Sequence, residues 1–313
     1  MEAQSVQPSQ IRKHYFLDQY VVIAPKRGLR PDSFAAKTAG HKLETPTSQP
    51  IEKDAAIMAV PGDDGKWTVK VIGNKFPALS PDNPKAYGKQ EIVIETPEHN
   101  LEFSALPIEQ ILRIFTAYRD RITNLSKVKG IRYVSVFKND GPAAGASIAH
   151  AHSQIVALPL VPPTLETEAN AIDDYQAEHN TCPYCDLIVW EQDKKVRVIY
   201  EDKSIIAIAP YASSYLFEAW ILPKRHVANF TELKHDELNS IATILKNLTT
   251  KLDNIKISYN FFLQNSLAGR NHHFSLRLEP RPNVWAGLEL GTGIILNAVP
   301  PEYATLWYQG KVS

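Results

Sequence analysis

Two histidines one residue apart, followed by a glutamine, are the residues of this chain best suited to chemistry. His150, His152 and Gln154 lie in the segment HAHSQ, which we expect to begin a β-strand. Because strand side chains alternate between the two faces of a sheet, all three should share one face. A neutral imidazole is a nucleophile near neutral pH, and its adduct with phosphorus can pass the group onward. The pattern favours covalent transfer of a phosphorus-containing group; the alternative is a structural strand with hydrogen-bonded histidines.

A loop rich in small residues precedes the histidines. It follows a predicted strand at 132–137 and contains Gly141, Gly145 and Ser147. Small residues let backbone N–H groups approach an anion closely. We therefore predict that this loop binds a phosphate group next to His152.

The composition excludes a general attraction to polyanions. The 313 residues include 34 Lys and Arg against 34 Asp and Glu, so the formal charge is zero, and neither nucleic acid nor an anionic membrane is an expected partner. No apolar run reaches signal-peptide length at the start or the roughly 20 residues of a membrane span. We expect a soluble cytoplasmic protein, long enough for two domains.

Hydrophobic periodicity predicts a mixed α and β architecture. Apolar residues recur at helical spacing over 108–125 and again over 238–252, so both ranges should be long amphipathic helices. Residues 37–53, rich in Thr, Pro and charge, should form a loop. Alternating or β-branched runs predict strands at 20–24, 67–72, 91–95, 132–137, from 150 onward, 196–200, 205–210, 219–222, 259–263 and 274–278.

The second half of the chain repeats the order of the first. Aligning residues 91–103 with 218–230 and continuing onward pairs His99 with His226, Phe103 with Phe230, His150 with His273 and His152 with Ser275. Only the first half therefore keeps the expected nucleophile. Residues 164–181, acidic and weakly patterned, should connect the two halves.

Four residues of the second half have the chemistry of a zinc site. Cys182 and Cys185 form a Cys-x-x-Cys motif, which in a cytosolic protein is a metal half-site or a redox pair more often than a disulfide. With His226 and His273 they make a Cys2His2 set that can close tetrahedrally around zinc. Because the protein would fill all four positions, we expect a structural zinc; the alternative is reduced, buried cysteines beside hydrogen-bonded histidines.

The histidine segment resembles the active-site motif of the galactose-1-phosphate uridylyltransferase family, within the histidine-triad superfamily. The residues in the family's spacing are Asn139, Gly141, Gly145, Ser147, His150, His152 and Gln154. Other segments similar to those of the family are IAPKRGLRPDSF with Arg27 and Arg30, NKFPAL at 74–79, PEHN at 97–100 and AGLELGTGIILNAVPPE at 286–302. Together they span almost the whole chain.

The resemblance implies an α+β fold of two histidine-triad-like units, each an antiparallel half-barrel sheet crossed by a long helix. We assign residues 1–163 to the first unit, 164–181 to a linker and 182–313 to the second unit with its zinc site. A homodimer is usual in the family, and its active site borrows residues across the interface. Exposed sheet edges must be covered, which also favours such an assembly.

The resemblance also implies a mechanism. His152 would attack the α-phosphorus of a nucleoside diphosphate sugar and expel a sugar 1-phosphate, while the carbonyl of His150 holds the other ring nitrogen. Ser147 and Gln154 would bind the phosphate oxygens and stabilise developing charge. The acceptor of the nucleotide could be a hexose 1-phosphate, inorganic phosphate or water, and no organic cofactor is expected.

Substrate contacts follow from the same resemblance. Arg27 and Arg30 would reach the phosphates or the base, with solvated surface arginines as the alternative. On the nucleotide side we expect Asn74, Phe76, Asn139 and Gly145, although Phe76 alone would read as a core residue. Glu289 matches the glutamate that binds hexose hydroxyls. Leu288, however, replaces a tyrosine typical of galactose enzymes, so nucleotidyl transfer is a firmer expectation than galactose and the chain is similar to a less characterised branch.

Metal binding in the first half should differ from the second. His99 and His150 lack cysteine partners, and His41 lies where many family members carry a Cys-x-x-Cys. We therefore expect no tight metal there. Glu168 matches a position that helps hold a second metal in some members, but the segment NHHFSLRLEPR lacks the usual histidines, so we expect no iron.

Two other functions remain open at this point. One is a phosphorylase or hydrolase of dinucleoside polyphosphates, as in the wider superfamily, which would release mononucleotides instead of a sugar 1-phosphate. The other is a nucleotide-binding module that kept the fold and lost turnover. The missing first-half cysteines favour the module, and the intact His152, Ser147 and Gln154 oppose it.

Overall fold

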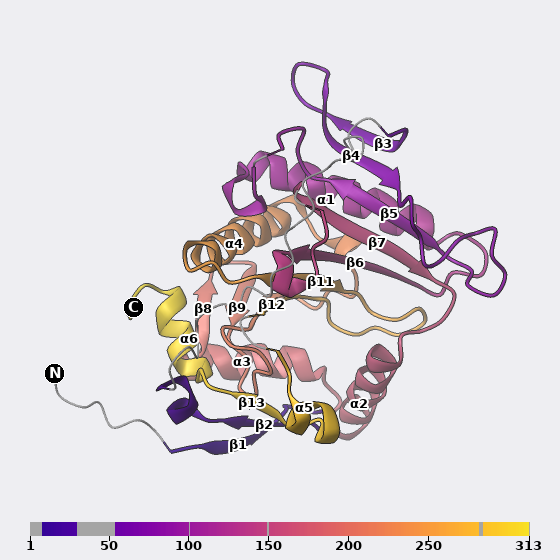
Figure 1. Ribbon diagram of the computed structural model, residues 1–313. Helices are drawn as coiled ribbons and strands as arrows, with labels where there is room; N and C mark the ends of the chain where they lie inside the picture. Colours follow the sequence, from indigo (N-terminus) through magenta and orange to yellow (C-terminus); the bar gives the residue numbers. More distant parts are fainter. Residues whose placement is uncertain (1–7, 30–53, 100, 149, 282–283, 313) are drawn as a thin grey trace.

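One large antiparallel sheet carries the strands of both halves of the chain (Figure 1). The computed structural model describes residues 8–29, 54–99, 101–148, 150–281 and 284–312. In spatial order the ten strands are β3 (Ala56–Pro61), β4 (Trp67–Gly73), β5 (Lys89–Ile94), β7 (His152–Leu158), β6 (Tyr133–Asp140), β11 (Tyr259–Gln264), β12 (Ser275–Pro280), β10 (Ala219–Pro223), β9 (Ile205–Ile208) and β8 (Val198–Glu201).

The strand order confirms the predicted repeat. Read from each edge inward, the first half runs β3-β4-β5-β7-β6 and the second β8-β9-β10-β12-β11, so equivalent strands occupy equivalent places. The halves join where β6 pairs antiparallel with β11, for example Asn139 opposite Asn260. The predicted α+β fold is therefore correct, with the two half-sheets fused into one.

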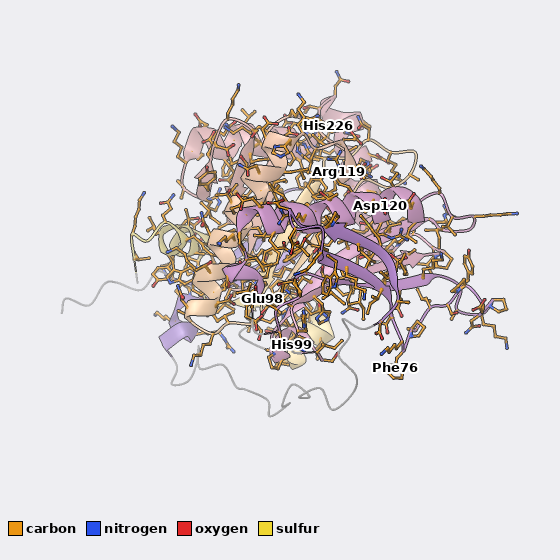
Figure 2. The ribbon with its side chains drawn as sticks, turned by 90° about the horizontal axis from the view of Figure 1, so that it is seen from above. Phe76, Glu98, His99, Arg119, Asp120 and His226 are labelled. Atoms are coloured by element: carbon orange, nitrogen blue, oxygen red, sulfur yellow. The ribbon has the colours of Figure 1, made fainter. Side chains whose placement is uncertain are left out.

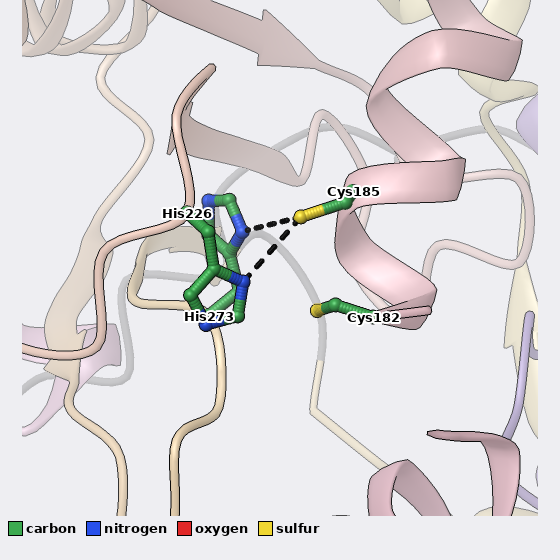
Figure 3. Close-up of side chains that lie close together, drawn as sticks. All are labelled: Cys182, Cys185, His226 and His273. Carbon is green, nitrogen blue, oxygen red and sulfur yellow. Dashed lines mark hydrogen bonds between the residues drawn. The ribbon is translucent and has the colours of Figure 1, made fainter. Parts of the chain in front are cut away.

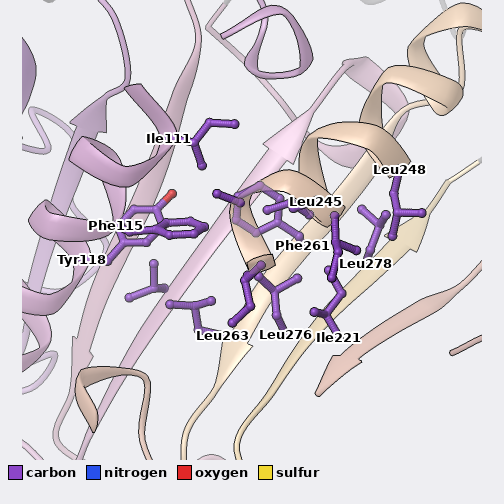
Figure 4. Close-up of a cluster of buried hydrophobic side chains, with 14 of the residues drawn as sticks. Ile111, Phe115, Tyr118, Ile221, Leu245, Leu248, Phe261, Leu263, Leu276 and Leu278 are labelled. Carbon is purple, nitrogen blue, oxygen red and sulfur yellow. The ribbon is translucent and has the colours of Figure 1, made fainter. Parts of the chain in front are cut away.

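Two long helices cover one face of this sheet, as their apolar spacing predicted. They are α1 (Ile108–Leu125) and α4 (His235–Asn254). Their buried stripes pack on the strands and on each other, because an amphipathic helix gains most of its stability by burying its apolar face. Figure 4 shows part of this core, including Ile111, Phe115, Tyr118, Leu245, Leu248, Phe261, Leu263, Leu276, Leu278 and Ile221.

The opposite face of the first half is the one that carries the histidine motif. Val93 of β5 belongs to the core under the helices, whereas its neighbours Ile92 and Ile94 belong to a separate buried cluster. In the ladder Ile94 lies opposite His152, and Ile92 lies opposite Gln154. Directly opposed residues point to the same face, so His152 and Gln154 share the face away from the helices.

The strand with the histidines begins later than predicted. The β7 ladder starts at His152, and His150 lies in a bend before it. The ring of His150 contacts the carbonyl oxygen of Thr96 at 2.7 Å, two residues beyond the end of β5 at Ile94. The shared face of His152 and Gln154 is confirmed, and His150 belongs to the loop.

Among the remaining helices and strands, only the strand at 20–24 was predicted from the sequence, and it forms β2 (Tyr20–Ile23). The range expected as a linker forms α2 (Pro163–His179), which is followed by α3 (Pro183–Lys194). Prolines at the first turn start both helices, and residues with positive φ, Asn180 and Lys195, end them. Smaller elements are β1 (Gln10–Lys13), β2 (Tyr20–Ile23), β13 (Ile295–Asn297), α5 (Gly287–Thr292) and α6 (Pro301–Tyr308).

The start of the chain lies against its end. β2 pairs parallel with β13 in a three-stranded sheet, and the guanidinium of Arg12 lies 2.9 Å from the carboxylate of Glu302. Residues 10–23, assigned from sequence to the first unit, therefore pack on the second. Within the described residues, no helix is both long and apolar enough to cross a membrane.

Candidate active site and zinc centre

His152 is buried with its ring orientation fixed by the backbone. Its side chain is 4% exposed, and its Nδ1 atom lies 2.8 Å from the carbonyl oxygen of His150. A carbonyl only accepts, so Nδ1 carries the proton and Nε2 keeps its lone pair. Burial, with the nearby Lys138 ammonium, lowers the pKa of His152 to about 4. The ring is therefore neutral at pH 7, with Nε2 as the nucleophilic atom.

A buried ion pair supports the histidine strand from the helix side. Lys138 donates to the carbonyl oxygen of His152 at 3.1 Å and to the carboxylate of Glu95 at 2.9 Å. Both side chains are almost fully buried. Burial opposes the charge of Lys138, but the carboxylates of Glu95 and Asp140 outweigh it and raise the Lys138 pKa. The backbone carbonyl of His152 thus accepts a hydrogen bond from a buried ammonium group.

The loop before the histidines has the backbone shape that its glycines allow. Gly141 and Gly145 have φ values of 79° and 87°, and a short helical turn, Pro142–Ala144, lies between them. Such φ values are unfavourable for residues with a Cβ atom. The side chain of Ser147 is exposed, so its hydroxyl is available to a ligand.

A pocket of about 440 Å³ opens on the same face of the sheet, where the halves meet. Its walls include Phe137 and Asn139 from the first half and Asn260 and Arg281 from the second. Phe137 is the cross-strand neighbour of Gln154, which places the pocket beside the histidine strand. Aromatic and amide groups with one guanidinium suit a polar, anionic ligand.

The predicted substrate residues are spread over the molecule. Phe76 is 92% exposed at the edge of the fold (Figure 2), so the core position considered for it is wrong. Asn74 uses its side-chain oxygen to accept from the backbone N–H of Phe76 at 2.8 Å and so shapes that loop. Arg27 is exposed in a short turn after β2. Arg30 and His41 lie outside the described residues.

Glu289 is engaged within its own helix. Its carboxylate accepts the backbone N–H of Ala286 at 2.9 Å and caps the start of α5. It is half-buried, and neighbouring Leu288 is exposed. No contact links it to the walls of the pocket among the described residues, so its role toward a hexose stays a prediction.

The four residues predicted to bind zinc converge (Figure 3). Sγ of Cys185 lies 3.4 Å from Nδ1 of His226 and 3.6 Å from Nδ1 of His273. With Cys182, one ligand atom from each residue lies within 4.8 Å of the others. Two sulfurs and two nitrogens at such spacing suit tetrahedral zinc.

The protonation of these side chains also suits a metal. Nε2 of His273 lies 2.8 Å from the carbonyl oxygen of Pro223, and Nε2 of His226 lies 3.2 Å from that of Asn271. Both rings thus donate outward and present the Nδ1 lone pair inward, an arrangement that carbonyl groups behind metal-binding histidines commonly impose. A hydrogen bond from the neighbouring Cys185 thiol lowers the pKa of Cys182, which favours its thiolate form.

The first half keeps a matching pair of histidines. Nδ1 of His99 lies 2.9 Å from Nδ1 of His150, whose Nε2 atom contacts Thr96 as His273 contacts Pro223. Figure 2 places His99 and His226 at opposite sides of the molecule. Among the described residues no cysteine accompanies the first pair.

The chain also matches known families over most of its length. The family model described as "Galactose-1-phosphate uridyl transferase, N-terminal domain" matches residues 78–162, and the corresponding C-terminal domain matches residues 168–270. A relative named ADP-glucose phosphorylase, from Arabidopsis thaliana, is 32% identical over 95% of this chain and 91% of its own length. The chain belongs to the galactose-1-phosphate uridyl transferase family.

Other members of the family are similar over large parts of the chain. A galactose-1-phosphate uridylyltransferase from Thermotoga maritima is 29% identical over 76% of this chain and 83% of its own. The crystal structure of an ADP-glucose phosphorylase from Arabidopsis thaliana with bound ADP-glucose has a TM-score of 0.82, with 30% identity, 98% of this chain covered and all of the other. A uridylyltransferase structure has a TM-score of 0.73 with 26% identity and 97% and 98% coverage. By their names, the Arabidopsis relative is a phosphorylase of ADP-glucose and the Thermotoga relative is a uridylyltransferase of galactose 1-phosphate.

Glu168, for which the sequence suggested a metal-binding role only by resemblance, is engaged in a buried ion pair. The carboxylate of Glu168 is buried and pairs with the guanidinium of Arg277 at 2.6 Å. It also accepts from the amide of Gln264 and the hydroxyl of Tyr184. These contacts hold the pKa of Glu168 low despite burial.

Sequence reasoning missed several residues of the site. Glu95 was expected only as the last residue of a strand, Lys138 lay just after the strand expected at 132–137, and Asn260 and Arg281 of the second half were not considered. A lysine at an inward position of an alternating strand was a usable signal, because a buried ammonium requires a partner. Nothing in the spacing indicated the contribution of the second half.

Proposed function

We propose that this protein is a nucleotide-sugar nucleotidyltransferase that forms a covalent nucleotidyl-His152 intermediate. The observation that carries the proposal is the 2.8 Å contact between Nδ1 of His152 and the carbonyl oxygen of His150. It leaves Nε2 as the lone-pair atom of a neutral ring. The glycine-containing loop before the histidines and the pocket on the same face of the sheet also support this proposal.

The first half-reaction forms one bond and breaks one. Nε2 of His152 attacks the α-phosphorus of a nucleoside diphosphate sugar, and the bond from that phosphorus to the bridging oxygen breaks. The sugar 1-phosphate leaves with the electron pair. The carbonyl of His150 stabilises the positive charge on the phosphorylated ring by accepting its Nδ1 proton in a hydrogen bond.

The loop from Gly141 to Ser147, here called the phosphate loop, would stabilise the negative charge that develops on the α-phosphate. Backbone N–H groups around Gly145, the hydroxyl of Ser147 and the amide of Gln154 are donors suited to the oxygens on the α-phosphorus. Each such donor typically contributes about 10²–10³ in rate when it strengthens in the transition state. His150 would act through the backbone, and its ring would stay engaged with Thr96.

For the second half-reaction we favour inorganic phosphate as the acceptor and an adenine nucleotide as the group transferred. Phosphate oxygen attacks the nucleotidyl phosphorus, the N–P bond breaks, and a nucleoside diphosphate leaves. Support comes from the coverage of the Arabidopsis ADP-glucose phosphorylase and from Leu288, which departs from the residue of galactose enzymes. Zinc at Cys182, Cys185, His226 and His273 would hold the second half together without touching the substrate.

The acceptor is tested by product analysis. We would incubate the protein with ADP-glucose and either inorganic phosphate or galactose 1-phosphate, and repeat both reactions with UDP-glucose. The proposal predicts ADP and glucose 1-phosphate from the first mixture at the highest rate. Faster formation of UDP-galactose from UDP-glucose and galactose 1-phosphate would overturn the phosphorylase assignment and favour uridylyl transfer.

A further inference from the structure

We propose that the second half, which has no counterpart of His152, orients the phosphate loop of the first half through Asn260. In this proposal Asn260 is a positioning residue that fixes the amide of Asn139 and the carbonyl of Ala144. The inference rests on the proposed function, because it concerns how fast the nucleotidyl-histidine forms.

The side-chain amide of Asn260 makes two bonds to the first half. Its Nδ2 atom lies 2.8 Å from Oδ1 of Asn139 and 2.9 Å from the carbonyl oxygen of Ala144. Asn260 and Asn139 are direct partners in the β11–β6 ladder. Both N–H groups of one amide are thus used on the loop that precedes the histidine motif.

This arrangement decides which end of the Asn139 amide faces a ligand. Oδ1 of Asn139 is occupied by Asn260, so its Nδ2 group is the end left to donate. That atom lies next to Gly145, since a Cβ atom built on this glycine would come within 3.8 Å of it. An anionic phosphate requires donors, and a reversed amide would present an oxygen instead.

Asn260 is itself held by charged and aromatic neighbours. Its Oδ1 atom accepts from Nε of Arg281, which fixes the amide orientation. The Arg281 guanidinium lies 2.9 Å from Glu279 and stacks 4.1 Å from the ring centre of Tyr215. In this series of hydrogen bonds Arg281 donates to Asn260, and Asn260 in turn donates to Asn139.

A second contact seats the same loop on the second half. Gly141 has a φ of 79°, and a Cβ atom at this position would collide with Oγ of Ser258. The backbone carbonyl of Ser258 in turn accepts the N–H of Arg281 at 2.6 Å. The loop is thus positioned at its start by Ser258 and at its turn by Asn260.

The test compares Asn260→Asp and Asn260→Ala with the unaltered protein. Aspartate keeps the size of asparagine and the bond from Arg281, but it cannot donate to Asn139 or Ala144. We expect the single-turnover rate of nucleotidyl-His152 formation to fall by about 10–100-fold in both variants, in line with loss of an oriented donor. Asn239→Ala, at an exposed position of α4, is the matched control and should keep the rate.

A double-mutant cycle separates positioning from a general structural role. If Asn260 acts mainly through Asn139, adding Asn260→Ala to Asn139→Ala should slow the reaction by no more than about 3-fold further, because coupled residues are not additive. Independent, fully multiplicative effects would overturn the proposal. So would a wild-type rate in Asn260→Asp, or a lower melting temperature with an unchanged rate.

The two hypotheses fail differently. If the unaltered protein forms no nucleotidyl adduct with any nucleotide sugar, the proposed function fails first. If it forms the adduct and the Asn260 variants form it equally fast, only the positioning role of Asn260 fails.

Discussion

The ammonium of Lys138 lies 2.9 Å from the carboxylate of Glu95, inside the core and directly behind His152. Replacing Lys138 by Met should leave the carboxylate buried without its cation. Breaking such a pair costs about 3–5 kcal/mol of unfolding free energy. Urea denaturation measures this, with Lys66→Met as the control, because its pair with Asp64 is solvent-exposed and should contribute less than about 1 kcal/mol. Equal midpoints for both variants would contradict the role given to Lys138.

The low pKa of His152 should be visible in the pH dependence of both the reaction rate and the stability. Its pKa of about 4 lies below the ordinary 6.5, first because of burial and then because of Lys138. The nucleophile stays neutral, so adduct formation should be constant from pH 8 to about 5 and fall only near pH 4. A fall centred near pH 6.5 would show an exposed, ordinary histidine.

The same shift predicts a change in stability. Between pH 6.5 and 4 the unfolded state binds a proton that the folded state excludes, so stability is lost as the pH falls through this window. The contribution is about 3 kcal/mol. A His152→Gln variant, compared by thermal unfolding at pH 7 and pH 5, should show a smaller loss than the unaltered protein.

Zinc should be bound in the second half with about one ion per chain. Cys185→Ser should remove it, since one of four ligands becomes a poor donor, and should lower the melting temperature. Elemental analysis of the purified protein measures the content, and His99→Ala serves as the control that keeps the zinc. Loss of zinc in the His99 variant but not in the Cys185 variant would place the metal in the first half and contradict this prediction.

Phe76 should contribute to ligand binding without contributing to stability. At 92% exposure it buries little surface in the fold, so Phe76→Ala should unfold at the same temperature. Stacking on a base is worth about 1–3 kcal/mol, so nucleotide affinity should fall by about 5–150-fold. Calorimetric titration with a nucleoside monophosphate checks this. Val189→Ala, another exposed apolar position, should change neither quantity.

Repeated local patterns made much of the fold predictable. The apolar spacing of 108–125 and 238–252 set both helices, and alternation set the strands that flank them. The alignment paired His150 with His273, and the structure gives both rings a contact from Nε2 to a backbone carbonyl oxygen. Side-chain type and spacing were sufficient to pair these residues, because the two halves place them at equivalent positions of the repeat.

Long-range contacts were not predictable in the same way. The helix α2 has weak amphipathic patterning, so its residues looked like a linker although Pro163 and Asn180 mark its ends. β1 and β2 join β13 across almost the full chain length, which no local signal encodes. The bond from Asn260 to Asn139 likewise depends on the pairing of β6 with β11.

The most direct test of the central claim is the intact mass of the protein after incubation with ADP-glucose, and separately with UDP-glucose, without an acceptor. We predict a gain of one nucleoside monophosphate with release of glucose 1-phosphate, and no gain in a folded His152→Ala variant. An unchanged mass with both nucleotide sugars, or an adduct that persists in His152→Ala, would contradict a nucleotidyl-His152 intermediate.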